Sequence, residues 1–183
     1  MKKITKKFLD ISVRYMILVL IALPGLSIFY FIFTPLTVNS TFFLLDLLYE
    51  ASLRGNVINL MNNFFIEIIA ACVAGSAYYL LLILNMSIQK IKLKKRLGLI
   101  FLAFLSFFII NILRILVLSV LYVNKFSLFD IAHRLFWYLG SIVFVAAIWF
   151  AEVKLFKIRE IPFYEDVKFL YKKSRQPGSR KTN

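Results

Sequence analysis

The chain has one cysteine, Cys72, and one histidine, His133, in 183 residues. A single cysteine cannot close an intrachain disulfide, which excludes a disulfide framework and a two-cysteine redox couple of the quinone-linked type. One cysteine and one histidine also supply too few ligands for a cysteine-based structural zinc site. Cys72 is therefore either a lone nucleophile or an inert buried thiol.

Glycine-rich phosphate-binding loops and internal repeats are absent from the sequence as well. We therefore expect neither a cofactor nor a metal ion. Acidic residues are scarce, with nine against 23 lysines and arginines, and the net charge is +14. In a soluble protein that charge would suggest a nucleic-acid partner, so the positions of the basic residues decide how to interpret it.

Apolar residues are abundant: 61% of the chain is hydrophobic and the mean hydropathy is +0.82. Runs of twenty or more mostly apolar residues recur, and each is long enough to cross a bilayer as a helix. We predict an all-α polytopic membrane bundle over residues 1–160, followed by a basic cytoplasmic tail over 161–183. Pro24 and Gly25 are expected to kink the first span. The four predicted spans cover about 11–33, 66–87, 98–123 and 129–153.

Between the first two spans lies TFFLLDLLYEASLRG, residues 41–55. Asp46, Glu50 and Arg54 recur every four residues, so on a helix they would form one polar stripe. This pattern predicts a helix over about 41–54 that lies in the membrane interface. A re-entrant half-helix is the alternative.

Nearly all the basic residues lie in three segments: the N-terminus, the loop between the second and third spans, and the tail. The exceptions are Arg54, Arg114, Lys125 and Arg134. The positive-inside rule places these three segments, and both termini, on the cytoplasmic side of the plasma membrane. Anionic lipid headgroups account for the charge, and we expect no nucleic-acid partner.

With this topology, three chemically capable residues lie in the outer half of the bundle. Cys72, Arg114 and His133 are about 9, 13 and 6 Å below the outer ends of their spans, at 1.5 Å per residue. An arginine within a span costs about 2.5–3.5 kcal/mol on insertion scales, so Arg114 is either satisfied by partners in the bundle or functional. His133 is either a ring at the membrane interface whose polar edge is exposed to water, or an acid–base group.

The neighbours of Cys72 also allow two interpretations. On a continuous helix, Cys72 would share a face with Gly75, Ser76 and Tyr79, which leaves room for another backbone to approach. Small residues of this kind are typical of a seam between packed helices. A thiolate at the same place would be stabilised by Arg114 if the guanidinium lies next to it.

Four further polar residues are candidates for supporting roles. Asn111 lies one helical turn before Arg114 and on the same face. Asp130 lies three residues before His133 and can fix its tautomer by a hydrogen bond. Arg134 is a second cation, next to the histidine in the sequence. Glu67 is an acid near the outer end of the second predicted span and can pair with a basic group.

The motifs around Cys72 in AACVAGSAYYLLL, Arg114 in NILRI and His133 in FDIAHRLFWYLG, all within residues 56–152, resemble those of the exosortase/archaeosortase family. The family consists of membrane-embedded cysteine transpeptidases of bacteria and archaea, and this chain looks most like its small archaeal members. The resemblance implies that Cys72 is the nucleophile, Arg114 a stabilising cation and His133 the acid–base group. Since some members use arginine at the third position, Arg134 stays an alternative.

The resemblance also implies the partners. The substrate would be a secreted protein whose C-terminal signal has a short motif, a transmembrane helix and a basic cluster. The enzyme would cleave near the motif on the outer side and pass the new C-terminus to a lipid-linked acceptor. Simple hydrolysis remains an alternative to transfer, and the oligomeric state stays open.

A non-enzymatic membrane protein is the competing interpretation. A transporter or channel subunit with Arg114 on a polar path predicts that polar residues continue through the inner halves of the spans. The inner halves of the last two spans offer Ser106, Ser141 and a terminal Glu152, which disfavours a conduit. An assembly scaffold predicts that Cys72→Ala leaves function intact.

Overall fold

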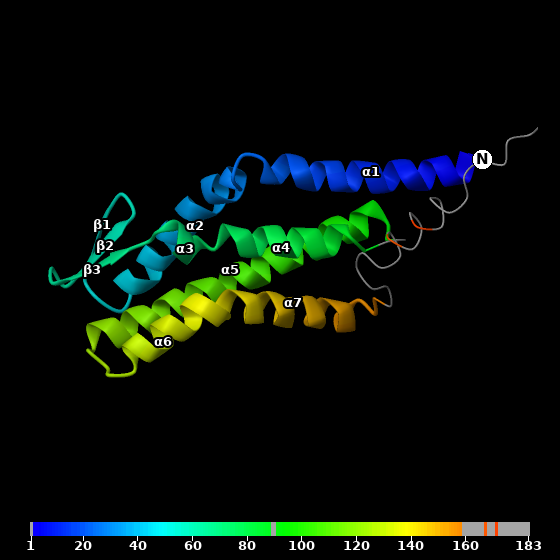
Figure 1. Ribbon diagram of the computed structural model, residues 1–183. Coiled ribbons are helices and arrows are strands. Elements are labelled where there is room, and N and C mark those ends of the chain that lie inside the picture. Colours follow the sequence, from blue (N-terminus) through cyan, green and yellow to red (C-terminus); the bar gives the residue numbers. More distant parts are fainter. Residues whose placement is uncertain (1, 89–90, 159–166, 168–170, 172–183) are drawn as a thin grey trace, which may run out of the picture.

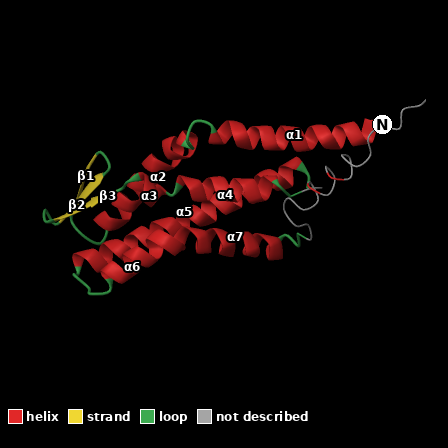
Figure 2. Ribbon diagram, in the orientation of Figure 1, coloured by secondary structure: helices red, strands yellow, loops and turns green. Residues whose placement is uncertain are grey.

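The computed structural model describes residues 2–88, 91–158, 167 and 171, and most of them are helical (Figure 1 and Figure 2). This confirms the helical prediction and adds one feature that it lacked, a small sheet at one end of the molecule. The elements are α1 (Lys2–Ala22), α2 (Ser27–Asp46), β1 (Ala51–Arg54), β2 (Val57–Leu60), β3 (Phe64–Glu67), α3 (Ala70–Val73), α4 (Gly75–Met86), α5 (Leu93–Val123), α6 (Phe129–Leu135), the π-helical turn η1 (Phe136–Gly140) and α7 (Ser141–Leu155).

The first predicted span is two helices. α1 ends at Ala22 and α2 begins at Ser27, so Pro24 and Gly25 break the helix fully where a kink was expected. Proline has no N–H to continue the helical ladder, and Gly25 adopts a left-handed φ of +63° that costs glycine little. α2 then continues to Asp46, well beyond the predicted end at residue 33.

The predicted interfacial helix over 41–54 is wrong, and so is the re-entrant alternative. Residues 41–46 end α2, whereas β1 pairs antiparallel with β2, and β2 pairs antiparallel with β3. Gly55 and Asn56 make the two-residue turn between Arg54 and Val57, with Gly55 at φ +61°, as expected of a tight hairpin. The Asp46 carboxylate accepts a hydrogen bond from the Ala51 N–H at 3.2 Å, so it caps β1 and belongs to no helical stripe.

The second predicted span, 66–87, is also interrupted. Its first residues belong to β3, and the helix that follows is broken at Ala74, which adopts a left-handed conformation (φ 56°, ψ 49°) between α3 and α4. Cys72 is thus on α3 while Gly75 and Tyr79 are on α4, and the expected common helical face does not exist. The missing side chain of Gly75 makes room for Tyr30, whose Cζ would lie 2.8 Å from a Cβ at that position.

The last two predicted spans agree with the observed helices. α5 is one helix of 31 residues that covers the range 98–123. α6, η1 and α7 follow one another without a break over 129–155. The π-helical turn in the middle is a feature that often marks functional sites in proteins. The predicted basic tail over 161–183 lies outside the described residues, except for Val167 and Tyr171.

An apolar core holds α2, α4, α5 and α7 together, and the rings of Phe33 and Tyr78 stack in it at 3.7 Å between centroids. α1 lies to one side and is joined to α4 by a hydrogen bond from the Tyr79 hydroxyl to the Leu18 carbonyl at 2.9 Å. In Figure 1, the start of α1, the connection between α4 and α5, and the end of α7 all lie at one end. The sheet lies at the opposite end.

The surface of α5 that faces away from the core is apolar along most of its length. Large exposed side chains recur every four residues on it: Leu97, Phe101, Leu105, Ile109, Leu113 and Val117. Two described helices, α2 and α5, are long and apolar enough to cross a membrane, and Ala70–Met86 is a shorter apolar helical segment.

Candidate active site

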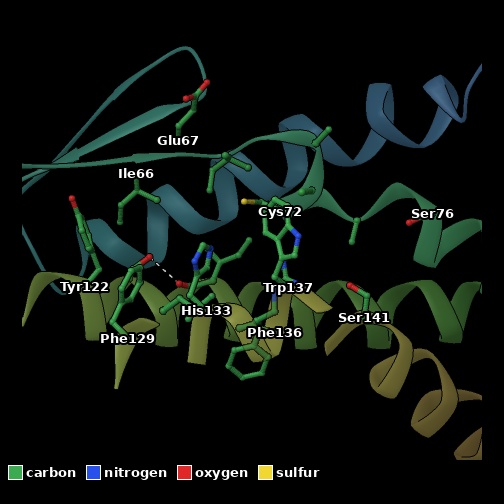
Figure 3. Close-up of a pocket in the computed structure, with 18 of the residues that line it drawn as sticks. Ile66, Glu67, Cys72, Ser76, Tyr122, Phe129, His133, Phe136, Trp137 and Ser141 are labelled. Carbon is green, nitrogen blue, oxygen red and sulfur yellow. Dashed lines mark hydrogen bonds between the residues drawn. The ribbon is translucent and has the colours of Figure 1, made fainter. Parts of the chain in front are cut away.

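A pocket of about 590 Å³ lies at the sheet end of the bundle. β3 and α3 form one wall, and α5 and α6 form the opposite wall (Figure 3). Cys72 from α3, Arg114 from α5 and His133 from α6 all line this pocket. The structure therefore brings together the three residues that the predicted topology places at similar depths in the outer half of the bundle.

Cys72 is half-buried and its sulfur points into the pocket (Figure 3). The Asn111 side chain, which is fully buried, donates a hydrogen bond from Nδ2 to the Cys72 carbonyl at 2.8 Å. The Cys72 N–H in turn donates to the Ile69 carbonyl at 2.9 Å. Asn111 thus ties the short helix α3 to α5 and fixes the backbone that carries the thiol.

Arg114 is only 9% exposed and lines the same pocket as Cys72. Its Nε is buried, and no described residue accepts a hydrogen bond from it. A buried donor without a partner costs about 1–3 kcal/mol, more for a charged group. Arg114 thus places a guanidinium at the pocket wall, and the described residues leave its Nε without an acceptor.

His133 is exposed to the pocket and held between two aromatic rings of its own helical face. Its ring stacks on Phe129, with centroids 5.4 Å apart and planes 8° apart, and meets Trp137 edge-on at 6.0 Å. All three residues line the pocket, as residues four apart on one helical face do. Figure 3 shows the imidazole rising from α6 toward the wall that carries Cys72.

The other predicted supporting residues do not join the site in the same way. Asp130 and Arg134 are exposed and do not line the pocket, and within the described chain Asp130 forms no hydrogen bond with His133. Glu67 lines the pocket as part of β3, but its carboxylate points away from Cys72 (Figure 3). The described part of the chain gives Glu67 no ion pair.

Several pocket residues were not anticipated from the sequence. Ser119 and Tyr122 follow Arg114 on the pocket side of α5, and Trp137 follows His133 by one turn. Helical spacing from the two candidates could have found Tyr122 and Trp137, but not Ser119, which is five residues after Arg114. Tyr30 comes from α2, and nothing in the local sequence indicates that it reaches the site.

In the described chain, no three His, Cys, Asp or Glu side chains come together as a group that could hold a metal ion. Comparisons with models of protein families, with curated proteins and with solved structures find no match for this chain. The chemistry of the site therefore rests on its own geometry: a thiol, a guanidinium and an imidazole on the walls of one largely apolar pocket.

Proposed function

We propose that this protein is an intramembrane cysteine peptidase or transpeptidase of the exosortase/archaeosortase type. It cleaves the C-terminal sorting signal of secreted proteins at the outer membrane face and transfers the product to a lipid-linked acceptor. The observation that carries the proposal is the shared pocket. Three separate elements, α3, α5 and α6, supply a nucleophile, a cation and an acid–base group to one cavity.

The proposal includes four membrane crossings, made by α1 with α2, α3 with α4, α5, and α6 with α7. The exposed apolar stripe of α5 supports this, because soluble proteins rarely expose a contiguous apolar surface of that extent. The lysine-rich segments connect to the end of the bundle opposite the sheet (Figure 1). The positive-inside rule then assigns that end to the cytoplasm, and the sheet and the pocket to the outer side.

The reaction divides acyl transfer into two steps. The Cys72 thiolate attacks the scissile carbonyl, and the C–N bond breaks as a thioester forms. Arg114 stabilises the thiolate and the developing oxyanion, an effect that is largest where water is scarce. His133 gives its proton to the leaving amine, then takes one from the acceptor hydroxyl or amine, which attacks the thioester and regenerates the thiol.

A transport function fits the interior less well. At the inner end of the bundle, Asn85 donates a hydrogen bond to Glu152 at 3.1 Å, which gives a second buried polar group. The fully buried rings of Tyr78 and Phe107 pack edge-to-face in the core between this pair and the pocket. Apolar packing of this kind in the core disfavours a polar path along the bundle.

The test is co-expression with a secreted reporter that ends in a recognition motif, a transmembrane helix and a basic cluster. Candidate tails come from secreted proteins encoded in the same genome. Cys72→Ala, Arg114→Ala and His133→Ala should each leave the reporter uncleaved while membrane insertion is unchanged, and Arg134→Ala serves as the matched control. Full cleavage by Cys72→Ala would overturn the proposed chemistry and favour a scaffold.

The topology can be tested with the same lone cysteine. A membrane-impermeant maleimide should label Cys72 from outside intact cells, and Cys72→Ala should abolish all labelling. Labelling from the cytoplasmic side alone would contradict the proposed orientation.

A further inference from the structure

The strand β3 forms an edge of the sheet, and it lies on the pocket. The strand order is β1-β2-β3, so β3 has a neighbour on one side only. Four consecutive residues at its end line the same pocket as Cys72, from Phe65 to Ile68. An open strand edge of this kind can hydrogen-bond an additional strand.

The register shows which backbone groups face the free edge. The Ile68 N–H donates to the Asn56 carbonyl at 2.9 Å, so Ile68 is directed toward β2. Since hydrogen-bonded and non-hydrogen-bonded pairs alternate in an antiparallel ladder, Ile66 faces β2 as well, and Phe65 and Glu67 direct their N–H and C=O groups outward. Within the described chain no hydrogen bond engages these outward groups.

The opposite edge of the sheet differs. By the same alternation, Ala51 of β1 directs its N–H away from β2, and the Asp46 carboxylate accepts a hydrogen bond from it. β1 also packs against α2. One edge is therefore capped and covered by the protein itself, and the other is left open where it borders the pocket.

The side chains and the chain direction connect this open edge with the thiol. Ile66 points into the pocket while Glu67 points away from it (Figure 3). The chain then passes from Ile68 to Cys72, and both line the pocket. A peptide that extends β3 would thus run along the wall that ends at the sulfur.

We propose that the substrate binds as a fourth strand on β3, with its backbone paired to Phe65 and Glu67, so that the peptide bond just past the strand is presented to Cys72. This inference rests on the proposed peptidase function and specifies its substrate as an extended peptide segment. Backbone pairing supplies affinity that does not depend on sequence, and alternate side chains supply specificity. Substrate side chains level with Ile66 enter the pocket beside Phe129 and Trp137, so apolar residues are favoured at alternate positions.

A reactive peptide library tests the binding mode without knowledge of the natural motif. The probe is a mixed-sequence pentapeptide library with a C-terminal chloromethyl ketone. The Cys72 thiolate displaces chloride from it and forms a thioether, so the alkylation rate reports delivery of the peptide to the sulfur. N-methylation at each position in turn should slow labelling about tenfold at alternate positions only, because only alternate N–H groups of an added strand face β3.

A pair of protein variants gives an independent readout. Glu67→Pro removes an outward N–H and leaves in place the pairing of Ile66 with β2 and the bond from Ile68 to Asn56, since proline is tolerated on edge strands. It should slow peptide labelling about tenfold and leave labelling by iodoacetamide, which needs no strand, unchanged. Glu67→Gln changes the same side chain but keeps the N–H, so slowing of peptide labelling by Glu67→Gln as large as that by Glu67→Pro would count against backbone pairing at this residue.

The outcomes separate the two proposals. If N-methylation slows labelling equally at all positions, or at none, strand addition is wrong and peptide chemistry at Cys72 can stand. If no library member labels Cys72 faster than iodoacetamide does, the proposed peptide function itself is contradicted. The N-methylation series uses the wild-type protein, so it decides even if Glu67→Pro fails to fold.

Discussion

Two arginines of α5 make a natural comparison. Arg96 and Arg114 lie on the same face of the helix, about five turns apart at 3.6 residues per turn, and are 8% and 9% exposed. Arg96 donates a hydrogen bond to the Ile88 carbonyl at 2.7 Å, just past the end of α4. No described residue accepts a hydrogen bond from the buried Nε of Arg114, which lines the pocket together with Cys72. Two arginines of similar burial on one helical face thus differ in their surroundings. Arg96 bonds to the backbone just after α4, whereas Arg114 faces the pocket.

The two ends of the bundle differ in the same way, in whether their polar groups bond to the protein or line a pocket. At the end opposite the sheet, Arg14 donates to the Met86 carbonyl at 2.9 Å and Asn85 bonds to Glu152, so buried polar groups join neighbouring helices to each other. At the sheet end, polar groups from three elements converge on a pocket of about 590 Å³. Buried polar groups that bond to the protein stabilise it, whereas those held around a cavity are available to a ligand.

Substitution of Arg114 should mainly slow processing, whereas substitution of Arg96 should mainly lower stability. Arg114→Gln should slow reporter processing about 100- to 1000-fold, the usual loss when an oxyanion-stabilising donor is removed, without lowering thermal stability in detergent. Arg96→Gln should destabilise the protein by about 1.5–3 kcal/mol and leave processing per folded molecule unchanged. Equal losses of processing in the two variants would remove the distinction between them.

A second pair compares the buried asparagines. Asn111→Ala removes the hydrogen bond that holds the Cys72 carbonyl, so stability should fall by about 1–3 kcal/mol and kcat should fall while KM changes little. Asn85→Ala leaves Glu152 without its partner and should lower stability by a similar amount, about 1–3 kcal/mol, with kcat unchanged. Steady-state kinetics and thermal unfolding measure both. An unchanged kcat in Asn111→Ala would mean that Asn111 is purely structural.

Two glycines test the packing that shapes the pocket. An alanine at Gly75 would press on the ring of Tyr30, which lines the pocket, so Gly75→Ala should cost about 1–3 kcal/mol of stability. Nothing lies within 4 Å of the corresponding position at Gly98 in α5, so Gly98→Ala should stabilise the protein by about 0.5–1 kcal/mol. Thermal unfolding of the two variants in the same detergent should shift in opposite directions, and a shared direction would count against the close contact with Tyr30.

The smallest effect is expected at Asp130. It is exposed and forms no hydrogen bond with His133 within the described chain, so Asp130→Asn should leave the rate of processing and its pH profile unchanged. A large loss of activity would show that Asp130 orients the imidazole during catalysis.

The helices that consist of long apolar runs, and the residues placed by regular helical spacing, could be predicted from the sequence. α5 and the succession of α6 and α7 lie where hydropathy places them. Arg114 and His133 lie on helices where they were predicted, and the regular rise of a helix converts their sequence positions into distance along the bundle. Cys72 reaches the same pocket from the short helix α3, which the sequence did not predict as a separate element. The spacing of Asn111 and Arg114 predicted that both lie on one helical face, whereas the bond from Asn111 to the Cys72 carbonyl was not predicted.

Predictions from the sequence were wrong where two local patterns favour different structures or where a break has no local signal. The four-residue spacing of Asp46, Glu50 and Arg54 fits a helix, yet the Gly55–Asn56 turn, with Val57 and Ile58 after it, favours the hairpin that is observed. The left-handed break at Ala74 carries no sequence signal of its own, because alanine rarely adopts that conformation. The free edge of β3 is a property of tertiary pairing, so no local pattern could reveal it.

In the proposed reaction, Cys72 carries the substrate as a thioester. Intact-mass analysis of the protein purified after co-expression with the reporter tests this directly. We expect a fraction of the wild-type protein to carry an adduct with the mass of the reporter up to its new C-terminus, removed by neutral hydroxylamine and absent from Cys72→Ala. Reporter cleavage by Cys72→Ala at the wild-type rate, with no such adduct on either protein, would contradict the thioester mechanism.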